Sequence, residues 1–179
     1  MQKSLVKFSD LIREAKKSSS DDRLADELIF TPRAELTLEL AVKEAYRLHH
    51  NLLSTAHLFL GLIELGQGVA FSIVQKMNLD IEVIRKEAEK EAPSGPNEVL
   101  GTSDTVPIRC SPRIISVAVL AQEEAKNLGH GYVGVEHLLL GLLKEEGSVD
   151  GCLLRRFSVD VVKIRQEILQ EIQPNFGAT

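Results

Sequence analysis

Histidine is the one residue type that recurs at a spacing suited to chemistry. His50 and His57 lie seven residues apart, and so do His130 and His137. Two imidazoles can bind a metal ion, but zinc sites normally add cysteine or carboxylate ligands at short spacings, which these pairs lack. Hydrogen bonds between the rings of a pair could instead fix the loop between two helices. The sequence favours this structural role, keeps metal binding as the alternative, and predicts no bound metal.

These histidine pairs belong to an internal repeat. Residues 31–87 align with residues 111–167 at a constant offset of 80 without a gap. The segment TPRAELTLELAVKEAYRLHH matches SPRIISVAVLAQEEAKNLGH, and TAHLFLGLIELGQGV matches VEHLLLGLLKEEGSV. A chance match would not keep its register over several elements. The chain is therefore a tandem duplication, and the two copies are expected to pack about a pseudo-two-fold axis.

Each copy reads as four helices, which makes the predicted fold all-α. The third is expected at 69–77 and 149–157, and Asp80 and Asp160 are expected to cap the fourth. A hydroxyl residue followed by proline, as in Thr31-Pro32, is typical of a helix start. Apolar residues follow at helical spacing, and the second helix of each copy is apolar nearly all round, which predicts burial. Gly61 and Gly141 lie inside it, where glycine costs about 1 kcal/mol relative to alanine, so a close helix crossing is expected. The predicted organisation is an N-terminal extension (1–29), repeat 1 (30–91), a linker (92–110), repeat 2 (111–172) and a tail (173–179).

The sequence favours neither a cysteine nucleophile nor a phosphate-binding loop. Cys110 and Cys152 form no CxxC pair, and the repeat places Phe30 and Ser72 at the matching positions, which argues against a cysteine nucleophile. The segments GLIELGQG and GLLKEEGS lack the GxxxxGK(S/T) pattern of a phosphate-binding loop and overlap a predicted helix. We expect no catalytic residue, no cofactor and no enzyme activity. The absence of a disulfide framework and of a leader segment predicts a cytoplasmic location.

The charge pattern restricts the partners. The net charge is −5, and no segment carries the basic stripe that nucleic-acid binding requires. No apolar run reaches the length of a membrane span. The amphipathic segment 3–17 is expected to pack on the body or to extend from it, with a membrane-surface helix as the alternative. We expect neither nucleic acid nor membrane as a partner.

Three charged residues stand where helices begin. Arg33 and Arg113 lie in the first turn of a predicted helix, where they could form surface ion pairs or recognise an anion or a peptide. Glu136 lies in the first turn of the buried helix of the second copy, and Ala56 takes its place in the first. Glu136 could complement the helix dipole or bind a cationic group. The sequence leaves these alternatives open.

The two repeats resemble the Clp N-terminal domain of ClpC-type Hsp100 unfoldases. The segments FTPRAELTLELA and LAQEEAKNLGHGYVGVEHLLLGLL carry this resemblance, which covers residues 30–172. It implies an α-helical domain that binds Clp unfoldase or protease components, adaptor proteins or substrate proteins. It also implies a site for phosphorylated arginine, in which the glutamate of a GTEH motif contacts the guanidinium group. That glutamate corresponds to Glu136 of GVEH.

The resemblance assigns candidate site residues in each copy. Those of the second copy are Glu136, Val135, Ser111 and Arg113. The equivalent site of the first copy, with STAH in place of the motif, is expected to be degenerate, and its residues are Ala56, Thr55, Thr31 and Arg33. The chain resembles stand-alone Clp N-terminal domain proteins, such as plastid Clp accessory proteins. We expect a non-catalytic binding module; the alternative is the recognition domain of a longer ATP-dependent unfoldase.

Overall fold

Helices dominate the computed structural model, as the sequence predicts. The structure describes residues 7–10, 13, 28–76, 80, 82–83, 85–86, 108–145 and 160–172. In the first copy the helices are α2 (Pro32–Arg47), α3 (Thr55–Glu64) and α4 (Val69–Lys76). In the second copy they are α6 (Pro112–Asn127), α7 (Val135–Lys144) and α9 (Val161–Ile172). The all-α prediction is confirmed, whereas the third helix expected at 149–157, most of the linker and the tail lie outside the described residues.

The helix starts follow the expected chemistry. Thr31 caps α2, and its hydroxyl accepts a hydrogen bond from the backbone N–H of Ala34 at 3.2 Å. Asp80 and Asp160 were expected to cap the last helix of each copy. The Asp80 carboxylate accepts the N–H of Glu82 at 2.8 Å, and that of Asp160 accepts the N–H of Val162 at 2.9 Å. These local contacts satisfy N–H groups that have no acceptor within a helix.

Short strands tie the two copies together. The strands β1 (Ile29–Phe30) and β4 (Tyr132–Val133) pair in parallel, and so do β2 (Leu52–Leu53) and β3 (Arg109–Cys110). Each ladder joins one copy to the other, and the repeat offset converts one ladder into the other. This exchange is the pattern that a pseudo-two-fold arrangement produces. The sequence did not predict these strands, because two residues are too few to show an alternating pattern.

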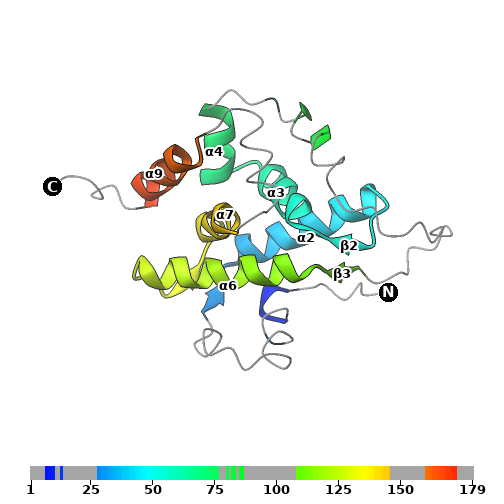
Figure 1. Cartoon of the computed structure of the whole chain (residues 1–179), viewed down its shortest axis with the longest axis horizontal. Helices are drawn as coiled ribbons and strands as arrows, with labels where there is room; N and C mark the ends of the chain where they lie inside the picture. Colours follow the sequence, from blue (N-terminus) through cyan, green and yellow to red (C-terminus); the bar gives the residue numbers. More distant parts are fainter. Residues whose placement is uncertain are drawn as a thin grey trace.

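The helices lie in three tiers (Figure 1). The long helices α2 and α6 form one tier, α3 and α7 pack on them, and α4 and α9 lie beyond. The α2–α3 crossing is close, because a Cβ at Gly61 would lie 2.8 Å from the backbone nitrogen of Ala41. At Gly141 the corresponding distance is 3.0 Å to the nitrogen of Ala121. The close crossing predicted from the repeated glycines is confirmed.

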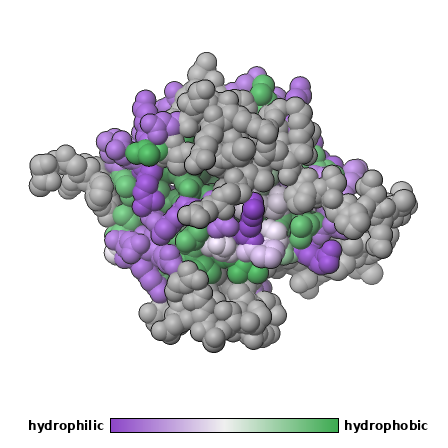
Figure 2. Space-filling view, viewed as in Figure 1, coloured by the Kyte–Doolittle hydropathy of each residue, from purple (hydrophilic) through white to green (hydrophobic). Residues whose placement is uncertain are grey.

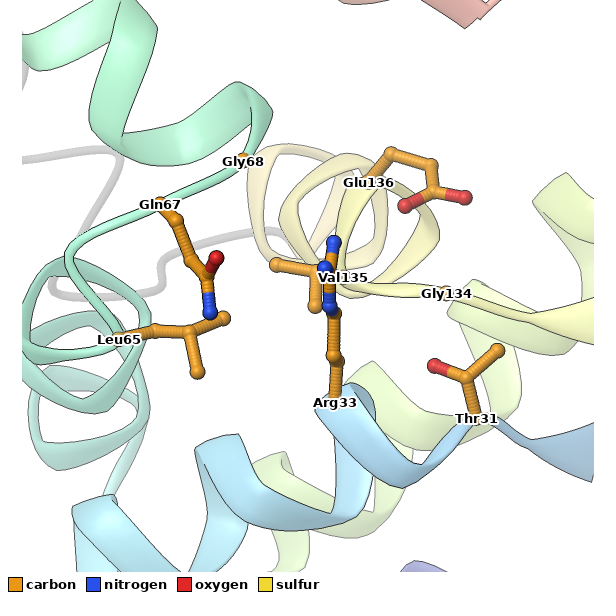
Figure 3. Close-up of a pocket in the computed structure, with 8 residues that line it drawn as sticks. All are labelled: Thr31, Arg33, Leu65, Gln67, Gly68, Gly134, Val135 and Glu136. Carbon is orange, nitrogen blue, oxygen red and sulfur yellow. The ribbon is translucent and has the colours of Figure 1, made fainter.

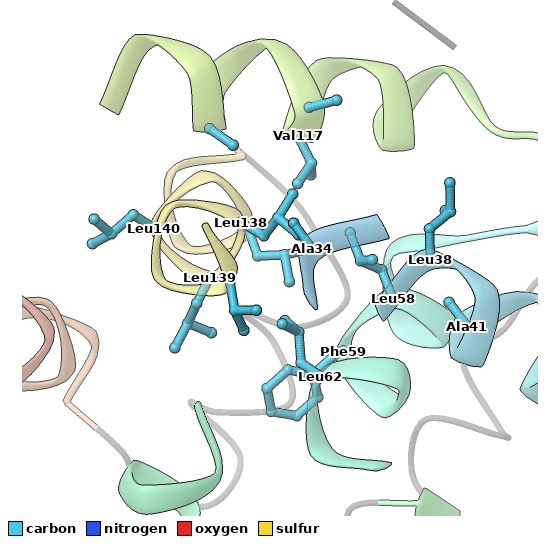
Figure 4. Close-up of a cluster of buried hydrophobic side chains, with 14 of the residues drawn as sticks. Ala34, Leu38, Ala41, Leu58, Phe59, Leu62, Val117, Leu138, Leu139 and Leu140 are labelled. Carbon is cyan, nitrogen blue, oxygen red and sulfur yellow. The ribbon is translucent and has the colours of Figure 1, made fainter. Parts of the chain in front are cut away.

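The core forms where the inner helices of both copies meet. Leu58 and Leu62 of α3 and Leu138 of α7 are fully buried, and Figure 4 shows them converging with side chains from α2 and α6. The burial predicted for the second helix of each copy, from His57 to Leu65 and from His137 to Leu143, holds as far as Ile63 and Leu142. Beyond these residues Glu64 is exposed, and Leu65 and Leu143 are half-buried. On the face drawn in Figure 2, the coloured hydrophilic and hydrophobic residues are intermixed.

Part of the N-terminal extension packs on the body. Phe8 is fully buried, and its ring stacks on that of Phe30 with 4.9 Å between centroids. The backbone N–H of Phe8 donates to the Glu35 carboxylate at 2.8 Å. Burial raises the pKa of Glu35, while hydrogen bonds from the N–H groups of Phe8 and Ser9 lower it in part. Among the described residues, no helix is long and apolar enough to cross a membrane.

Candidate functional site

A cavity of about 300 Å³ opens where two helices begin (Figure 3). The start of α2, the start of α7 and the loop between α3 and α4 surround it. Figure 3 shows Arg33 pointing from α2 toward the first turn of α7, with Gln67 and Leu65 on the side away from Gly134. Its lining residues are Thr31, Arg33, Leu65, Gln67, Gly68, Gly134, Val135 and Glu136.

The β1–β4 ladder brings the two helix starts together. β1 leads directly into α2, and β4 leads through Gly134 into α7. The backbone N–H of Thr31 continues the ladder by donating to the carbonyl oxygen of Val133 at 2.9 Å. The residue pairs 29/132 and 30/133 are in register, so Thr31 lies opposite Gly134. The cavity is therefore built from both copies of the repeat.

This construction groups the candidate residues differently from the sequence analysis, which grouped them by copy. Thr31 and Arg33 of the first copy lie with Val135 and Glu136 of the second. Ser111 and Arg113, which the sequence grouped with Glu136, instead follow the other ladder. The physical reason is the exchange of strands, which pairs the start of each long helix with the opposite copy.

At the symmetry-related position, where α6 and α3 begin, the residue that corresponds to Glu136 is buried. The N–H of Ser111 donates to the carbonyl oxygen of Leu53 at 2.9 Å, which places the start of α6 beside the start of α3. There Ala56 is fully buried and Thr55 is 1% exposed. The side chain of Glu136, by contrast, is 21% exposed. A ligand can reach the acidic position of the second copy but not the alanine that replaces it in the first.

The charges of the cavity suit a ligand that carries both signs. The first N–H groups of α7 have no acceptor within the helix, whereas α2 adds only that of Arg33, because Pro32 has no N–H and that of Ala34 is bonded to Thr31. The dipoles of both helices add positive potential there. The exposed guanidinium of Arg33 adds a cation, and the Glu136 carboxylate supplies an acceptor. Within the described residues Arg33 and Glu136 form no ion pair with each other. An anion at the helix starts and a cationic donor at Glu136 would both find partners.

Gly134 leaves room for the Glu136 carboxylate. A Cβ at residue 134 would lie 2.6 Å from Oε2 of Glu136, which is closer than real side chains approach. The φ of Gly134 is −95°, a value that any residue adopts, so the backbone itself does not require glycine. In the first copy Ser54 occupies this position, and Ala56 replaces the glutamate. The glycine therefore leaves space for the acid to fold back over the start of α7.

The histidine pairs hold the same helix starts. His137 Nδ1 accepts the backbone N–H of Gly134 at 2.9 Å, so Nε2 carries the proton and donates to His130 Nδ1 at 2.8 Å. His57 likewise accepts the N–H of Ser54 at 3.0 Å and contacts His50 Nδ1 at 2.8 Å. Both inner rings are fully buried. These contacts fit the structural role that the sequence favours.

Burial also changes the protonation of these rings. It lowers the pKa of His57 to about 4, and the adjacent His50 contributes to the decrease. It lowers the pKa of His137 as well, while the nearby Glu136 carboxylate, 3.6 Å from Nδ1, acts in the opposite direction. Each inner ring is therefore neutral near pH 7 and available as a hydrogen-bond acceptor.

The other reactive side chains that the structure describes form neither a metal site nor an activated nucleophile. In the part of the chain that the structure describes, no three histidine, cysteine or acidic side chains gather as metal ligands would. Cys110 is a free thiol, and burial raises its pKa to about 11, which keeps it protonated. Cys152 lies outside the described residues. A thiol in that state is a poor nucleophile.

Sequence reasoning missed part of the cavity lining. Leu65, Gln67 and Gly68 lie in the loop after α3 and carry no catalytic or ligand-binding pattern. Gly68 has a φ of 89°, which favours glycine and makes the turn that brings this loop to the cavity. The glycines of this loop predict a turn, but not which surface the turn faces.

Comparison with known protein families gives a clear match. The family model described as the Clp repeat (R) N-terminal domain matches residues 29–148 and 109–176. The chaperone protein ClpB of Oceanobacillus iheyensis is 40% identical over 146 residues, which are 82% of this chain and 17% of that protein. The negative regulator of genetic competence ClpC/MecB of Bacillus subtilis is 41% identical over 146 residues, with the same two shares. The chain thus spans 17% of the length of these relatives.

Solved structures show the same fold at lower identity. The N-terminal domain of the caseinolytic protease associated chaperone ClpD from Arabidopsis thaliana superposes with a TM-score of 0.64 at 22% identity, covering 80% of this chain and 94% of that one. The Hsp104 N-terminal domain from Candida albicans gives a TM-score of 0.63 at 18% identity, covering 81% and 92%. The fold that the sequence predicts is therefore one that other proteins share.

Proposed function

The chain belongs to the Clp repeat N-terminal domain family, and on this basis we propose that it is a binding module of a Clp chaperone–protease system. Its partners are substrate proteins, adaptor proteins or components of the Clp machine. The module binds without catalysing a reaction: among the described residues, the buried histidines are used as helix caps and the half-buried Cys110 thiol stays protonated. This role is the same whether the module acts alone, in the cytoplasm, or is joined to ATPase modules.

We further propose that the cavity between α2 and α7 binds phosphorylated arginine on partner proteins. The observation that carries this proposal is the joint presence of two helix starts, Arg33 and Glu136 around one opening. The phosphoryl group accepts hydrogen bonds from the first N–H groups of α7 and from the backbone N–H and the guanidinium of Arg33. The guanidinium nitrogens donate to the Glu136 carboxylate, which is a charge-assisted contact.

The proposed site is single. Ala56 cannot accept a hydrogen bond, and it is fully buried at the symmetry-related position. Hydrogen bonds to charged groups contribute about 1.5–3 kcal/mol, which corresponds to about tenfold to a hundredfold in affinity. One molecule of phosphoarginine per chain is therefore the expected stoichiometry. Ser111 and Arg113 do not contribute to this site.

Titration calorimetry with free phosphoarginine tests the proposal. We expect one binding event with the wild-type chain and a loss of about tenfold or more in affinity with Glu136→Gln. Glu171→Gln is the matched control, because it removes the same charge from an exposed residue of α9. Arginine without the phosphoryl group and inorganic phosphate should each bind more weakly than phosphoarginine. Equal binding by wild type and Glu136→Gln would contradict the assigned role of the carboxylate.

A further inference from the structure

An exposed apolar pair lies beside the cavity, and nothing in the proposed function uses it. Ile29 of β1 is 78% exposed and Tyr132 of β4 is 47% exposed. The two residues are direct partners in the β1–β4 ladder. Single exposed apolar residues are common on protein surfaces, but two that are paired on one ladder form a contiguous apolar patch. We call Ile29 and Tyr132 the apolar platform.

The platform faces the same way as the cavity. Thr31 and Gly134 continue the two strands in an extended conformation, with ψ values of 155° and 179°. Side chains alternate along an extended strand, so Ile29 shares a face with Thr31, and Tyr132 shares a face with Gly134. Phe30 and Val133, which lie between them, are buried on the opposite face. Two residues of strand separate the platform from the cavity, which is about 6.5 Å.

Two histidine rings hold Tyr132 of the platform in place. His130 stacks on the ring of Tyr132, with 5.6 Å between centroids and 4° between the ring planes. The ring of His130 is in turn hydrogen-bonded to the buried His137, which accepts the N–H of Gly134. The same buried histidine therefore fixes the start of α7 and supports Tyr132. A preorganised aromatic surface loses little conformational entropy when a partner binds.

The other ladder has no such platform. The repeat offset places Leu52 at the position of Tyr132 and Arg109 at the position of Ile29. Leu52 is half-buried, and Arg109 introduces a charge. The apolar pair and Glu136 thus occur together at the same end of the molecule. Such a combination fits a ligand that is polar at one point and apolar nearby.

We propose that the apolar platform is a second contact for the partner, which is an extended peptide with a large apolar side chain two residues from its phosphorylated arginine. This inference rests on the proposed function of the cavity. In an extended peptide, side chains two residues apart point the same way and are separated by about 6.5 Å, which matches the spacing from cavity to platform. The cavity then binds the phosphorylated arginine, and the platform favours those modified peptides that carry an apolar side chain at the right spacing.

Peptide affinities for the full chain test this inference. Three peptides share a phosphoarginine flanked by glycine and serine; one carries leucine two residues before it, one carries leucine two residues after it, and one carries serine at both positions. We expect one leucine peptide to bind about tenfold more tightly than the serine peptide, as expected for burial of an apolar side chain. Ile29→Ser should remove most of this gain. Val162→Ser, at a residue that is 64% exposed on α9, is the matched control and should keep it.

The outcomes separate this inference from the proposed function. Equal affinities of all three peptides for the wild-type chain would overturn the platform, and so would a leucine gain that survives Ile29→Ser. In those cases free phosphoarginine would still bind, and the role of the cavity would stand. Failure of free phosphoarginine and of every peptide to bind would overturn both.

Discussion

Acidification should destabilise this fold through His57, the buried histidine at the start of α3. His57 Nδ1 accepts the backbone N–H of Ser54 at 3.0 Å and lies 2.8 Å from the Ser54 hydroxyl oxygen. A proton on Nδ1 would oppose the N–H donor and leave the hydroxyl oxygen as its one nearby acceptor. The ring is also fully buried, so the charged form has no water to solvate it. Both effects favour the neutral ring in the folded chain. The unfolded chain has neither of them and takes up the proton more readily.

The size of the effect follows from the two pKa values. The pKa of His57 is about 4 in the folded chain, against an ordinary value of 6.5. As the pH falls below 6.5, the unfolded state binds a proton that the folded state refuses until about pH 4. The free energy of unfolding therefore decreases between these values and levels off below them. Between about pH 7.5 and about pH 4.5 the loss from this residue is about 2.5 kcal/mol, at about 1.4 kcal/mol per pKa unit.

Urea denaturation at a series of pH values measures this loss. Other ionisable groups of the chain also respond to pH, so the comparison needs a variant that removes only the His57 contribution. His57→Gln is suited to this, because glutamine at the third helical position can accept the N–H of the capping residue but does not titrate. We expect the variant to be less stable at neutral pH, since it loses ring packing and the contact with His50. Its stability should, however, fall less on acidification, by about 2.5 kcal/mol.

Parallel pH profiles of the two proteins would refute this reasoning. They would mean that His57 takes up its proton as easily in the folded chain as in the unfolded one. The hydrogen bond from Ser54 would then not keep Nδ1 free of a proton.

Three further predictions address the helix crossing, the N-terminal segment and the position of the acid. Gly61→Ala should lower the free energy of unfolding by about 1–3 kcal/mol, because the new methyl group meets backbone atoms of α2; an unchanged urea midpoint would contradict the close crossing. Phe8→Ala should speed hydrogen exchange at the Phe8 amide by about tenfold or more, because the ring stack that keeps this amide on Glu35 is lost; unchanged protection would count against docking. Gly134→Ser should leave the fold intact and weaken phosphoarginine binding by about tenfold, because it displaces the Glu136 carboxylate; unchanged affinity would show that the glycine has no positioning role.

The repeat made much of the fold predictable. Helix starts such as Thr31-Pro32 depend on the nearest few residues, so they are visible in the sequence. Gly61 and Gly141 stood out because they recur at the same point of two otherwise apolar helices, and the structure shows the crossing that requires them. Helix starts and repeated glycines can be recognised in the sequence because each depends on residues that are close together along the chain.

The composition of the candidate site was not predictable in the same way. The resemblance singled out Glu136 and grouped it with Ser111 and Arg113, whereas the cavity places it with Thr31 and Arg33. The ladder that brings Thr31 beside Gly134 joins residues about a hundred positions apart and is only two residues long. No periodicity can reveal so short a pairing. Gln67 lines the cavity because the turn between α3 and α4 places it there, and the direction of this turn depends on how the two helices pack.

The most direct test of the account follows backbone amides by NMR during a titration with phosphoarginine. If the cavity between α2 and α7 is the single site, the amides of Arg33, Val135 and Glu136 should shift together along one saturating curve. The amides of Ala56 and Arg113, at the closed symmetry-related position, should stay where they are. Equal shifts at both positions, or shifts at Ala56 and Arg113 without shifts at Val135 and Glu136, would contradict the account.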